Sequence, residues 1–300
     1  MFTRRQTLKT LVTGTAAMVA LNLPLDVLAA ARGLTWTHFQ ADEAGFLRAP
    51  VLIEGESEAI LIDGGFTLAD GRALAEAIKA TGKRLTTIYV SQSDPDYYFS
   101  LGPVKAAFPD ARVIADAATV AAINGNVEKK LAVWGPQLKD NGPQVLADVV
   151  IPTVSSEPGL TLDGETIEIV PAGALANRRY LWVPSLDAVF GGVLVFSGIH
   201  VWMADTPTSE QRQAWIAALD EMAARNPKVV VPGHMAPGSA LDASAIAYTR
   251  AYLVAFEEEA ARAADSAALI KAMKARFPSA GEDFSLELSA KVVKGEMKWG

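Results

Sequence analysis

The residues best suited to chemistry lie in one short segment, "VSQSDPDYYFSLG", which covers residues 90–102. Asp94 and Asp96 lie two positions apart there, with Gln92 before them and Tyr97 directly after. Two neighbouring carboxylates repel each other unless a cation lies nearby or one of them takes up a proton. Carboxylate oxygens suit a hard metal ion, and such a pair also suits proton transfer. The segment therefore predicts a cation site or an acid–base pair.

Histidines and arginines elsewhere in the chain offer partners for these carboxylates. His234 ends the strand-like run "KVVVPGH", where it suits a hydrogen bond to Asp96 or to a backbone carbonyl, or alternatively metal ligation. His200 in "SGIHVW" follows another apolar run and is expected at the pocket rim or half-buried in a loop. Arg178 and Arg179 are adjacent. We expect one of their guanidiniums to lie beside the carboxylates, the alternative being that both point into water.

Composition excludes several other kinds of function. The 300-residue chain has no cysteine, so disulfides, thiolate nucleophiles and cysteine-ligated zinc are excluded. Its formal net charge is −7, and without a basic run it lacks the usual surface of a nucleic-acid-binding protein. Neither a Gly-x-Ser-x-Gly nucleophile motif nor a glycine-rich phosphate loop occurs. A hydrophobic content of 50% is enough for a full-sized core.

The elements that must position these residues form two similar halves. Strand-like runs at 50–57 and 58–65 are followed by an amphipathic helix-like stretch at 69–82 and a buried strand at 84–90. Further helices are expected at 103–108, 116–138, 208–226 and 239–262, and further strands at 111–115, 160–170, 178–184, 187–195 and 228–234. Strands followed by helices in each half indicate a single α/β or α+β domain over 31–300, and suggest two packed sheets with helices outside.

Five segments in this order resemble the metallo-β-lactamase-fold hydrolases. They are "AILIDGG", "TTIYVSQSDPDYYFSLG", "VPAGALANRRYLWVP", "AVFGGVLVFSGIHVW" and "VVVPGHMAPG". The resemblance covers about Trp36 to Phe256 and implies a single-domain αββα sandwich. It also implies a zinc site in which the second segment supplies His-x-His-x-Asp-His, and in which the bound water becomes hydroxide near neutral pH.

The ligand positions of that family are mostly replaced in this sequence. In chain order they fall on Gln92, Asp94, Asp96, Tyr97, Gly173 or Ala174, Gly192 or Gly191, and His234. Asp96 and His234 alone keep the family's residue type, and the glycines and alanine offer no side-chain donor. The resemblance therefore implies the frame of a hydrolase without its usual dizinc centre.

Three functions remain open at this point. The first is a non-catalytic or ligand-binding protein whose cleft includes Gln92, Asp94, Tyr97, Arg178 and His200. The second is a hydrolase with a single metal, Zn, Mn or Fe, held by Asp94, Asp96 and His234. The third is a metal-free acid–base enzyme that uses the pair Asp94 and Asp96 together with His234. Each implies a small-molecule ligand or substrate.

Residues 1–30 have the pattern of an export signal. Arg4 and Arg5 precede a mildly apolar stretch, and small residues follow, so cleavage is expected near Ala29 to Ala31. The apolar stretch is too short to span a bilayer stably. Paired arginines resemble a twin-arginine signal, which implies the twin-arginine export machinery as a partner and a periplasmic or secreted location. An ordinary secretory signal is the alternative.

Overall fold

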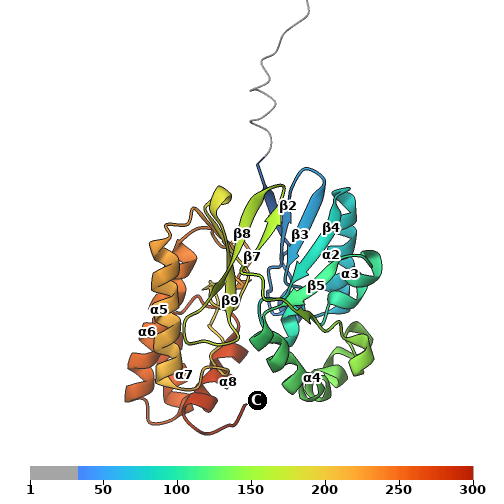
Figure 1. Cartoon of the computed structure of the whole chain (residues 1–300). Helices are drawn as coiled ribbons and strands as arrows, with labels where there is room; N and C mark the ends of the chain where they lie inside the picture. The colour runs from blue at the N-terminus through green and yellow to red at the C-terminus, as the bar shows by residue number, and fades with distance from the viewer. Residues whose placement is uncertain (1–32, 300) are drawn as a thin grey trace, which may run out of the picture. The chain divides into compact units, whose positions relative to one another are not determined.

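The structure, a computed structural model, describes residues 33–299. Its first sheet has the strand order β1-β2-β3-β4-β5-β6 (Figure 1). Strands β1 to β3 pair antiparallel, and β3 to β6 pair parallel. These strands are β1 (Thr35–His38), β2 (Val51–Glu54), β3 (Glu58–Ile62), β4 (Arg84–Tyr89), β5 (Arg112–Ala115) and β6 (Thr153–Val154).

Helices connect the parallel strands of this sheet, because parallel neighbours require a crossover. They are α2 (Leu68–Ala80), α3 (Leu101–Ala107) and α4 (Ala117–Leu138). The Thr67 hydroxyl accepts a hydrogen bond from the Asp70 N–H, and the Asp70 carboxylate accepts one from the Thr67 N–H, so α2 starts with a capping box. Asp116 caps α4 through the Ala118 N–H, as the sequence predicts.

The second sheet has the order β12-β10-β9-β8-β7. Its strands are β7 (Gly159–Leu162), β8 (Glu165–Pro171), β9 (Arg179–Val183), β10 (Ala188–Phe190) and β12 (Val229–Val230). A separate parallel pair, β11 (Phe196–Ser197) and β13 (His234–Met235), lies beyond β10 in the chain. This pair fixes the backbone of His234 beside the segment that follows β10.

Of the other helices, the first two run along the side of the second sheet away from the first sheet, and the last two lie at its lower end (Figure 1). They are α5 (Ser209–Ala224), α6 (Ser244–Arg262), α7 (Ser266–Arg276) and α8 (Asp283–Val293). Single 3₁₀ turns are η1 (Glu43–Gly45), η2 (Pro95–Tyr97), η3 (Lys139–Asn141), η4 (Leu146–Asp148) and η5 (Pro184–Leu186). No helix within 33–299 is long and apolar enough to cross a membrane.

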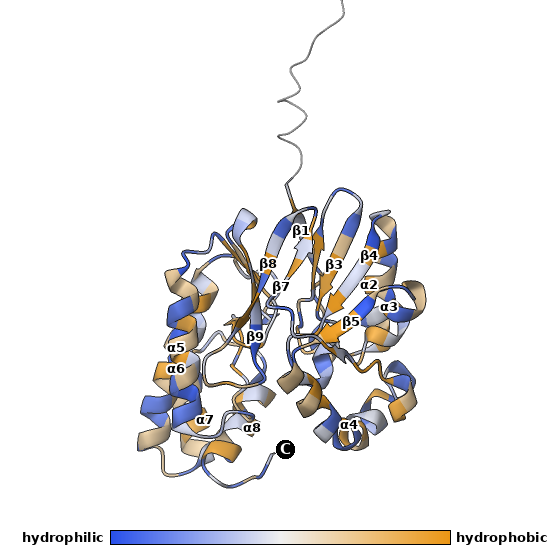
Figure 2. Ribbon diagram, in the orientation of Figure 1, coloured by the Kyte–Doolittle hydropathy of each residue, from blue (hydrophilic) through white to orange (hydrophobic). Residues whose placement is uncertain are grey.

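The two sheets bury a common core, which confirms the expected αββα sandwich. Side chains from both sheets meet in one buried cluster that includes Ile53, Ile60, Ile62, Leu181, Val183 and Phe190. Figure 2 shows hydrophobic colour concentrated on strands such as β3 and β5, whereas the helices alternate between hydrophilic and hydrophobic colour. Each sheet is therefore covered by an amphipathic helical layer.

Two expected strands are shorter than the sequence predicts. The run 187–195 pairs only as far as Phe190, because Gly191 and Gly192 have left-handed φ angles of 71° and 77°. The run 228–234 is divided between β12 and β13 around Pro232, which has no N–H for a strand ladder. Both interruptions turn backbone toward the site described below. The expected export signal at 1–30 lies outside the described residues.

Candidate ligand site and its buried ion network

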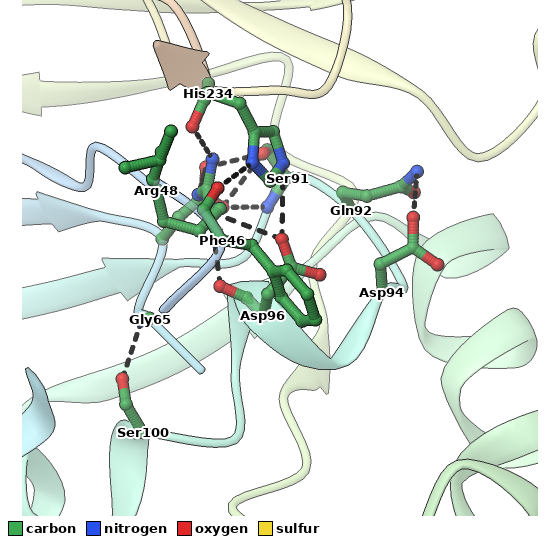
Figure 3. Close-up of polar contacts among 12 residues, drawn as sticks. Phe46, Arg48, Gly65, Ser91, Gln92, Asp94, Asp96, Ser100 and His234 are labelled. Atoms are coloured by element: carbon green, nitrogen blue, oxygen red, sulfur yellow. Dashed lines mark hydrogen bonds and ion pairs between the residues drawn. The ribbon is translucent and has the colours of Figure 1, made fainter. Parts of the chain in front are cut away.

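The carboxylates of the opening segment lie just after β4, where the chain turns into η2. Asp96 is in the first turn of η2 and its side chain is 12% exposed. The nearest guanidinium belongs to Arg48, whose Nε lies 3.7 Å from Asp96 Oδ2 and donates to the Asp96 carbonyl at 3.1 Å. Arg48 itself is completely buried. Figure 3 shows Arg48, Asp96 and His234 converging on one point.

The Arg48 guanidinium contacts a carboxylate, a backbone carbonyl and an aromatic ring. Its Nη2 lies 3.4 Å from Asp63 Oδ2, and its Nη1 donates to the Gly233 carbonyl. The guanidinium carbon lies 3.5 Å from the centroid of the Tyr97 ring, which stacks beneath it. The Arg48 backbone pairs with His234 in an isolated antiparallel bridge. The Arg48 guanidinium is therefore a structural cation, fixed in place by contacts within the fold.

Asp63 connects the same network to the second sheet. Its carboxylate accepts hydrogen bonds from the Ser91 N–H and hydroxyl at 2.7 and 2.8 Å. The Ser91 oxygen in turn accepts from the Gly192 N–H at 2.9 Å. A side chain at position 192 would have its Cβ 2.3 Å from the Arg179 carbonyl oxygen, so this backbone approach requires glycine. There is no room here for a bridging carboxylate.

His234 completes the network on the side that faces the cavity. Its Nδ1 lies 2.7 Å from the Phe46 carbonyl oxygen, and its Nε2 lies 3.2 Å from Asp96 Oδ2. A carbonyl oxygen only accepts, so Nδ1 carries a proton, and the Nε2 contact needs a further proton between the imidazole and the carboxylate. The ring also stacks on Phe196 at 5.1 Å. Both nitrogens of His234 are thus occupied.

The pKa values of the two aspartates reflect both their burial and the charged groups beside them. Burial alone raises the pKa of Asp96, but the hydrogen bond and charge of His234, together with Arg48, bring it below its ordinary value. Asp96 is therefore a carboxylate at neutral pH, and it faces His234 Nε2 and Arg48 Nε. Burial raises the pKa of Asp63, and Arg48 and the Ser91 hydrogen bonds oppose this rise. Arg48 is thus the cation that Asp63 and Asp96 share.

Asp94 lies on the other side of the same turn and outside this network (Figure 3). It accepts from Gln92 Nε2 at 3.2 Å and lies 3.8 Å from Lys130 Nζ on α4. Burial and the nearby Asp205 raise the pKa of Asp94 to about 8, and Lys130 opposes this only in part. Asp94 and Asp96 therefore have opposite protonation at neutral pH, although they are two residues apart.

An apolar cavity of about 70 Å³ opens in front of Asp96 and His234. Asp94, Lys130 and Glu282 also line it. Its walls are largely aromatic and comprise Phe46, Phe66, Trp134, Phe196, Trp202, Phe284 and Trp299. An apolar cavity with a few convergent polar groups is typical of a small-molecule site.

The C-terminal segment forms one wall of this cavity. The Trp299 ring lies 5.2 Å from the Trp202 ring at an interplanar angle of 76°. Both indole N–H groups donate to the carboxylate of Asp205, at 3.1 and 2.5 Å. Lys130 Nζ lies 4.9 Å from the Trp299 ring centroid. The segment that carries Trp299 is thus fastened across the cavity.

The structure gathers only some of the expected site residues. His200 is 1% exposed, with Nδ1 2.8 Å from the Tyr252 hydroxyl on α6, and it does not line the aromatic cavity. Tyr97 lies beneath Arg48 and is also buried. Arg179 pairs with Asp116 at 3.0 Å, whereas Arg178 is 3% exposed and lies over Trp215.

The cation beside Asp96 is therefore Arg48, and the hypothesis that Arg178 or Arg179 supplies it is wrong. Arg48 stands in "FLRAPVLIEG", where it interrupts an apolar run just before a buried strand. A lone arginine in such a run is rarely buried unless it is paired. The position of Arg48 in this apolar run was therefore a sign, visible in the sequence, that it is buried and paired.

Comparison with known proteins identifies the family. The sequence model of the metallo-beta-lactamase superfamily matches residues 47–234, which is more than half of the chain. The protein therefore belongs to this superfamily. No curated protein matches it in sequence.

Two solved structures support the fold alone, because both are less than 20% identical to this chain. A metallo-beta-lactamase family protein from Thermus thermophilus is 16% identical with a TM-score of 0.60, over 88% of this chain and 92% of its own. The metallo-beta-lactamase from Pontibacter korlensis is 19% identical with a TM-score of 0.52, over 74% and 95%. The chain thus has nearly the full extent of these neighbours.

Zinc is the metal that this superfamily usually binds, and the residues at this site do not fit it. Among the residues that the structure describes, no group of three or more His, Cys, Asp or Glu side chains is arranged to hold a metal ion. The Arg48 guanidinium lies against Asp96, both nitrogens of His234 are engaged, and Asp94 turns toward Lys130. A metal held by Asp94, Asp96 and His234 would have to displace these contacts.

Proposed function

We propose that this protein is a ligand-binding member of the metallo-beta-lactamase superfamily in which an internal ion network replaces the metal centre. One observation carries the proposal, namely the guanidinium of Arg48 between Asp63 and Asp96. The Arg48 guanidinium already supplies positive charge beside these carboxylates. They therefore do not need a metal ion to offset their negative charge. The aromatic cavity in front of His234 is the proposed binding place for a small apolar molecule.

Metal analysis and thermal melting test this proposal. The protein purified without added metal should contain well under one zinc per chain, measured by mass spectrometry of the metals. Added Zn or Mn should leave its melting temperature unchanged, because only a ligand that binds the folded state shifts it. Stoichiometric zinc that survives dialysis and raises the melting temperature would overturn the proposal.

A second candidate function is metal-free acid–base catalysis, and the position of Glu282 favours it. Glu282 has a left-handed φ of 61° at the start of α8 and lines the cavity with His234. Burial raises the pKa of Glu282, and His234 opposes this rise. A proton-bearing imidazole and a carboxyl of raised pKa at one cavity are the groups that general acid–base chemistry needs.

Ester hydrolysis in the presence of a chelator distinguishes this candidate from simple binding. An enzyme of this kind should turn over p-nitrophenyl esters with EDTA present and lose that activity in both His234→Gln and Glu282→Gln. A ligand-binding protein should give the same background rate in the parent and in both variants.

We also propose that the chain is exported by the twin-arginine route, on the support of Arg4, Arg5 and the apolar stretch after them. Replacing both arginines with lysines should leave precursor in the cytoplasm, detected by fractionation and immunoblot. Unimpaired export of the lysine variant would indicate the general secretory route instead.

A further inference from the structure

Arg178 is a buried cation that no carboxylate within residues 33–299 contacts directly. Arg178 is 3% exposed, and its Nη1 has no hydrogen-bond partner among the residues that the structure describes. Its guanidinium carbon lies 4.7 Å from the centroid of the Trp215 ring, which fixes the plane of the group without accepting a hydrogen bond. Burial accordingly lowers the pKa of Arg178. A guanidinium stays protonated in proteins, so its charge requires an acceptor.

The two carboxylates nearest to Arg178 are committed elsewhere. Asp205 accepts hydrogen bonds from the indoles of Trp202 and Trp299. Asp94 accepts from Gln92 and lies closest to Lys130. Both act on Arg178 only through their charge at longer range. Arg178 therefore differs from Arg48, which meets its carboxylates directly.

A second cavity, of about 370 Å³, lies beside Arg178. It is distinct from the aromatic cavity, with which it shares Asp94 as a lining residue. Its polar walls come from four separate parts of the chain and include Gln92, Asn126, Asn177, Asp205 and Gln211. The Oδ1 atom of Asn126 is a second buried polar atom without a hydrogen-bond partner in the described part of the chain. The cavity thus presents one donor group and one acceptor that are both unsatisfied.

We propose that this polar cavity binds a small organic carboxylate that carries a neighbouring hydroxyl or amino group. The planar fork of a guanidinium matches the two oxygens of a carboxylate, which would satisfy Arg178. The O–H or N–H of the same molecule would satisfy the Asn126 oxygen. The amides of Gln92, Asn177 and Gln211 supply further donors and acceptors for such a ligand. This inference does not depend on the function proposed for the aromatic cavity.

Four compounds of nearly equal size test the proposal by isothermal titration calorimetry. L-lactate has the carboxylate and a hydroxyl, L-alanine has the carboxylate and an ammonium, propionate has the carboxylate alone, and L-lactamide lacks the carboxylate. We expect lactate or alanine to bind in about the millimolar range that such small ligands reach. Propionate should bind more weakly, and lactamide should not bind. Tighter binding of lactate would identify the ligand as a hydroxy acid, and tighter binding of alanine would identify it as an amino acid.

Substitutions in the cavity test whether the acid binds there. Arg178→Met should weaken the binding of the preferred acid by about ten- to a hundredfold, as expected for the loss of a charged hydrogen-bonding group. Asn126→Ala should weaken that acid but leave propionate unchanged. Arg250→Gln is the control, because Arg250 pairs with Asp220 at 2.6 Å at the surface and does not line this cavity. It should bind like the parent.

Three results would overturn the proposal. They are the absence of binding by both lactate and alanine at millimolar concentration, equal binding of lactamide, and undiminished binding in Arg178→Met. Thermal melting provides a second measurement besides calorimetry. The preferred acid should raise the melting temperature of the parent and not that of Arg178→Met. Failure here leaves the metal test of the proposed function unaffected.

Discussion

Two buried arginines in this protein have opposite surroundings. Arg48 contacts Asp63, Asp96, the Gly233 carbonyl and the face of Tyr97. Arg178 has an aromatic ring on one face and lies at a polar cavity, and its Nη1 has no hydrogen-bond partner in the described chain. Arg48 Nη2 also lacks a hydrogen bond there, but it lies 3.4 Å from the Asp63 carboxylate. A buried charge is tolerated when partners in the fold surround it, and otherwise it needs water or a ligand. The first arginine is thus part of the structure, whereas the second belongs to the proposed binding site.

The largest effect should come from removing the partnered arginine. Arg48→Met leaves Asp63 and Asp96 buried without their cation, and breaking such a buried pair costs about 3–5 kcal/mol. Urea unfolding measures the loss. Arg250→Gln is the control, because Arg250 pairs with Asp220 at the surface and exposed pairs contribute at most about 1 kcal/mol. Equal losses in the two variants would show that the Arg48 network does not stabilise the fold.

Asp96→Asn should cost less, about 1.5–3 kcal/mol, because Arg48 keeps Asp63 while a charged hydrogen bond is lost. The difference from the parent should shrink as the pH falls. The pKa of Asp96 is lowered in the folded protein, so its contribution is present above the ordinary carboxyl pKa of about 4 and is lost below it. Added Zn or Mn should shift neither melting curve. A metal-dependent rise in the parent that the variant lacks would favour the single-metal hydrolase.

Arg178→Met should change stability in the opposite direction. Without a bound carboxylate, replacing this buried cation should raise the free energy of unfolding by about 1–3 kcal/mol, the usual cost of an unsatisfied buried group. Arg179→Met, which breaks the ion pair with Asp116, should lower it. Urea unfolding in carboxylate-free buffer measures both. A loss in Arg178→Met as large as that in Arg48→Met would remove the distinction between the two arginines.

An effect that appears only as a dependence on pH should come from Asp94, which lines both cavities. Its pKa is raised to about 8, so the folded protein holds a proton that the unfolded chain releases near its ordinary value. The parent should therefore lose stability relative to Asp94→Asn as the pH rises from about 4 to about 8. Thermal melts across this range measure the difference. Parallel pH profiles in parent and variant would show that Asp94 is ionised normally.

Most elements of the fold could be predicted from local sequence, because turns and caps are local. The hairpin around Asp163 and the capping of α4 by Asp116 required only neighbouring residues. The strand ends at Gly191 and Pro232 were missed, because an apolar run shows where a strand is possible and not where its pairing stops.

The site was harder to predict, since its contacts join distant parts of the chain. Asp96 and His234 were identified as candidates and lie 3.2 Å apart, but Arg48 is 48 residues from Asp96 and belongs to no motif. Alternation along a strand indicates that Arg178 and Arg179 face opposite ways, without indicating which one is buried. His200 follows a strand as expected, yet its ring turns toward α6.

The two indoles that share Asp205 give the protein an internal optical signal. Trp202 and Trp299 lie 5.2 Å apart and nearly perpendicular, close enough for their electronic transitions to couple. Asp205 also lines the polar cavity, whereas both rings line the aromatic one. Near-ultraviolet circular dichroism should therefore respond when either cavity is filled. Unlabelled protein can then show whether the two cavities are occupied independently or together.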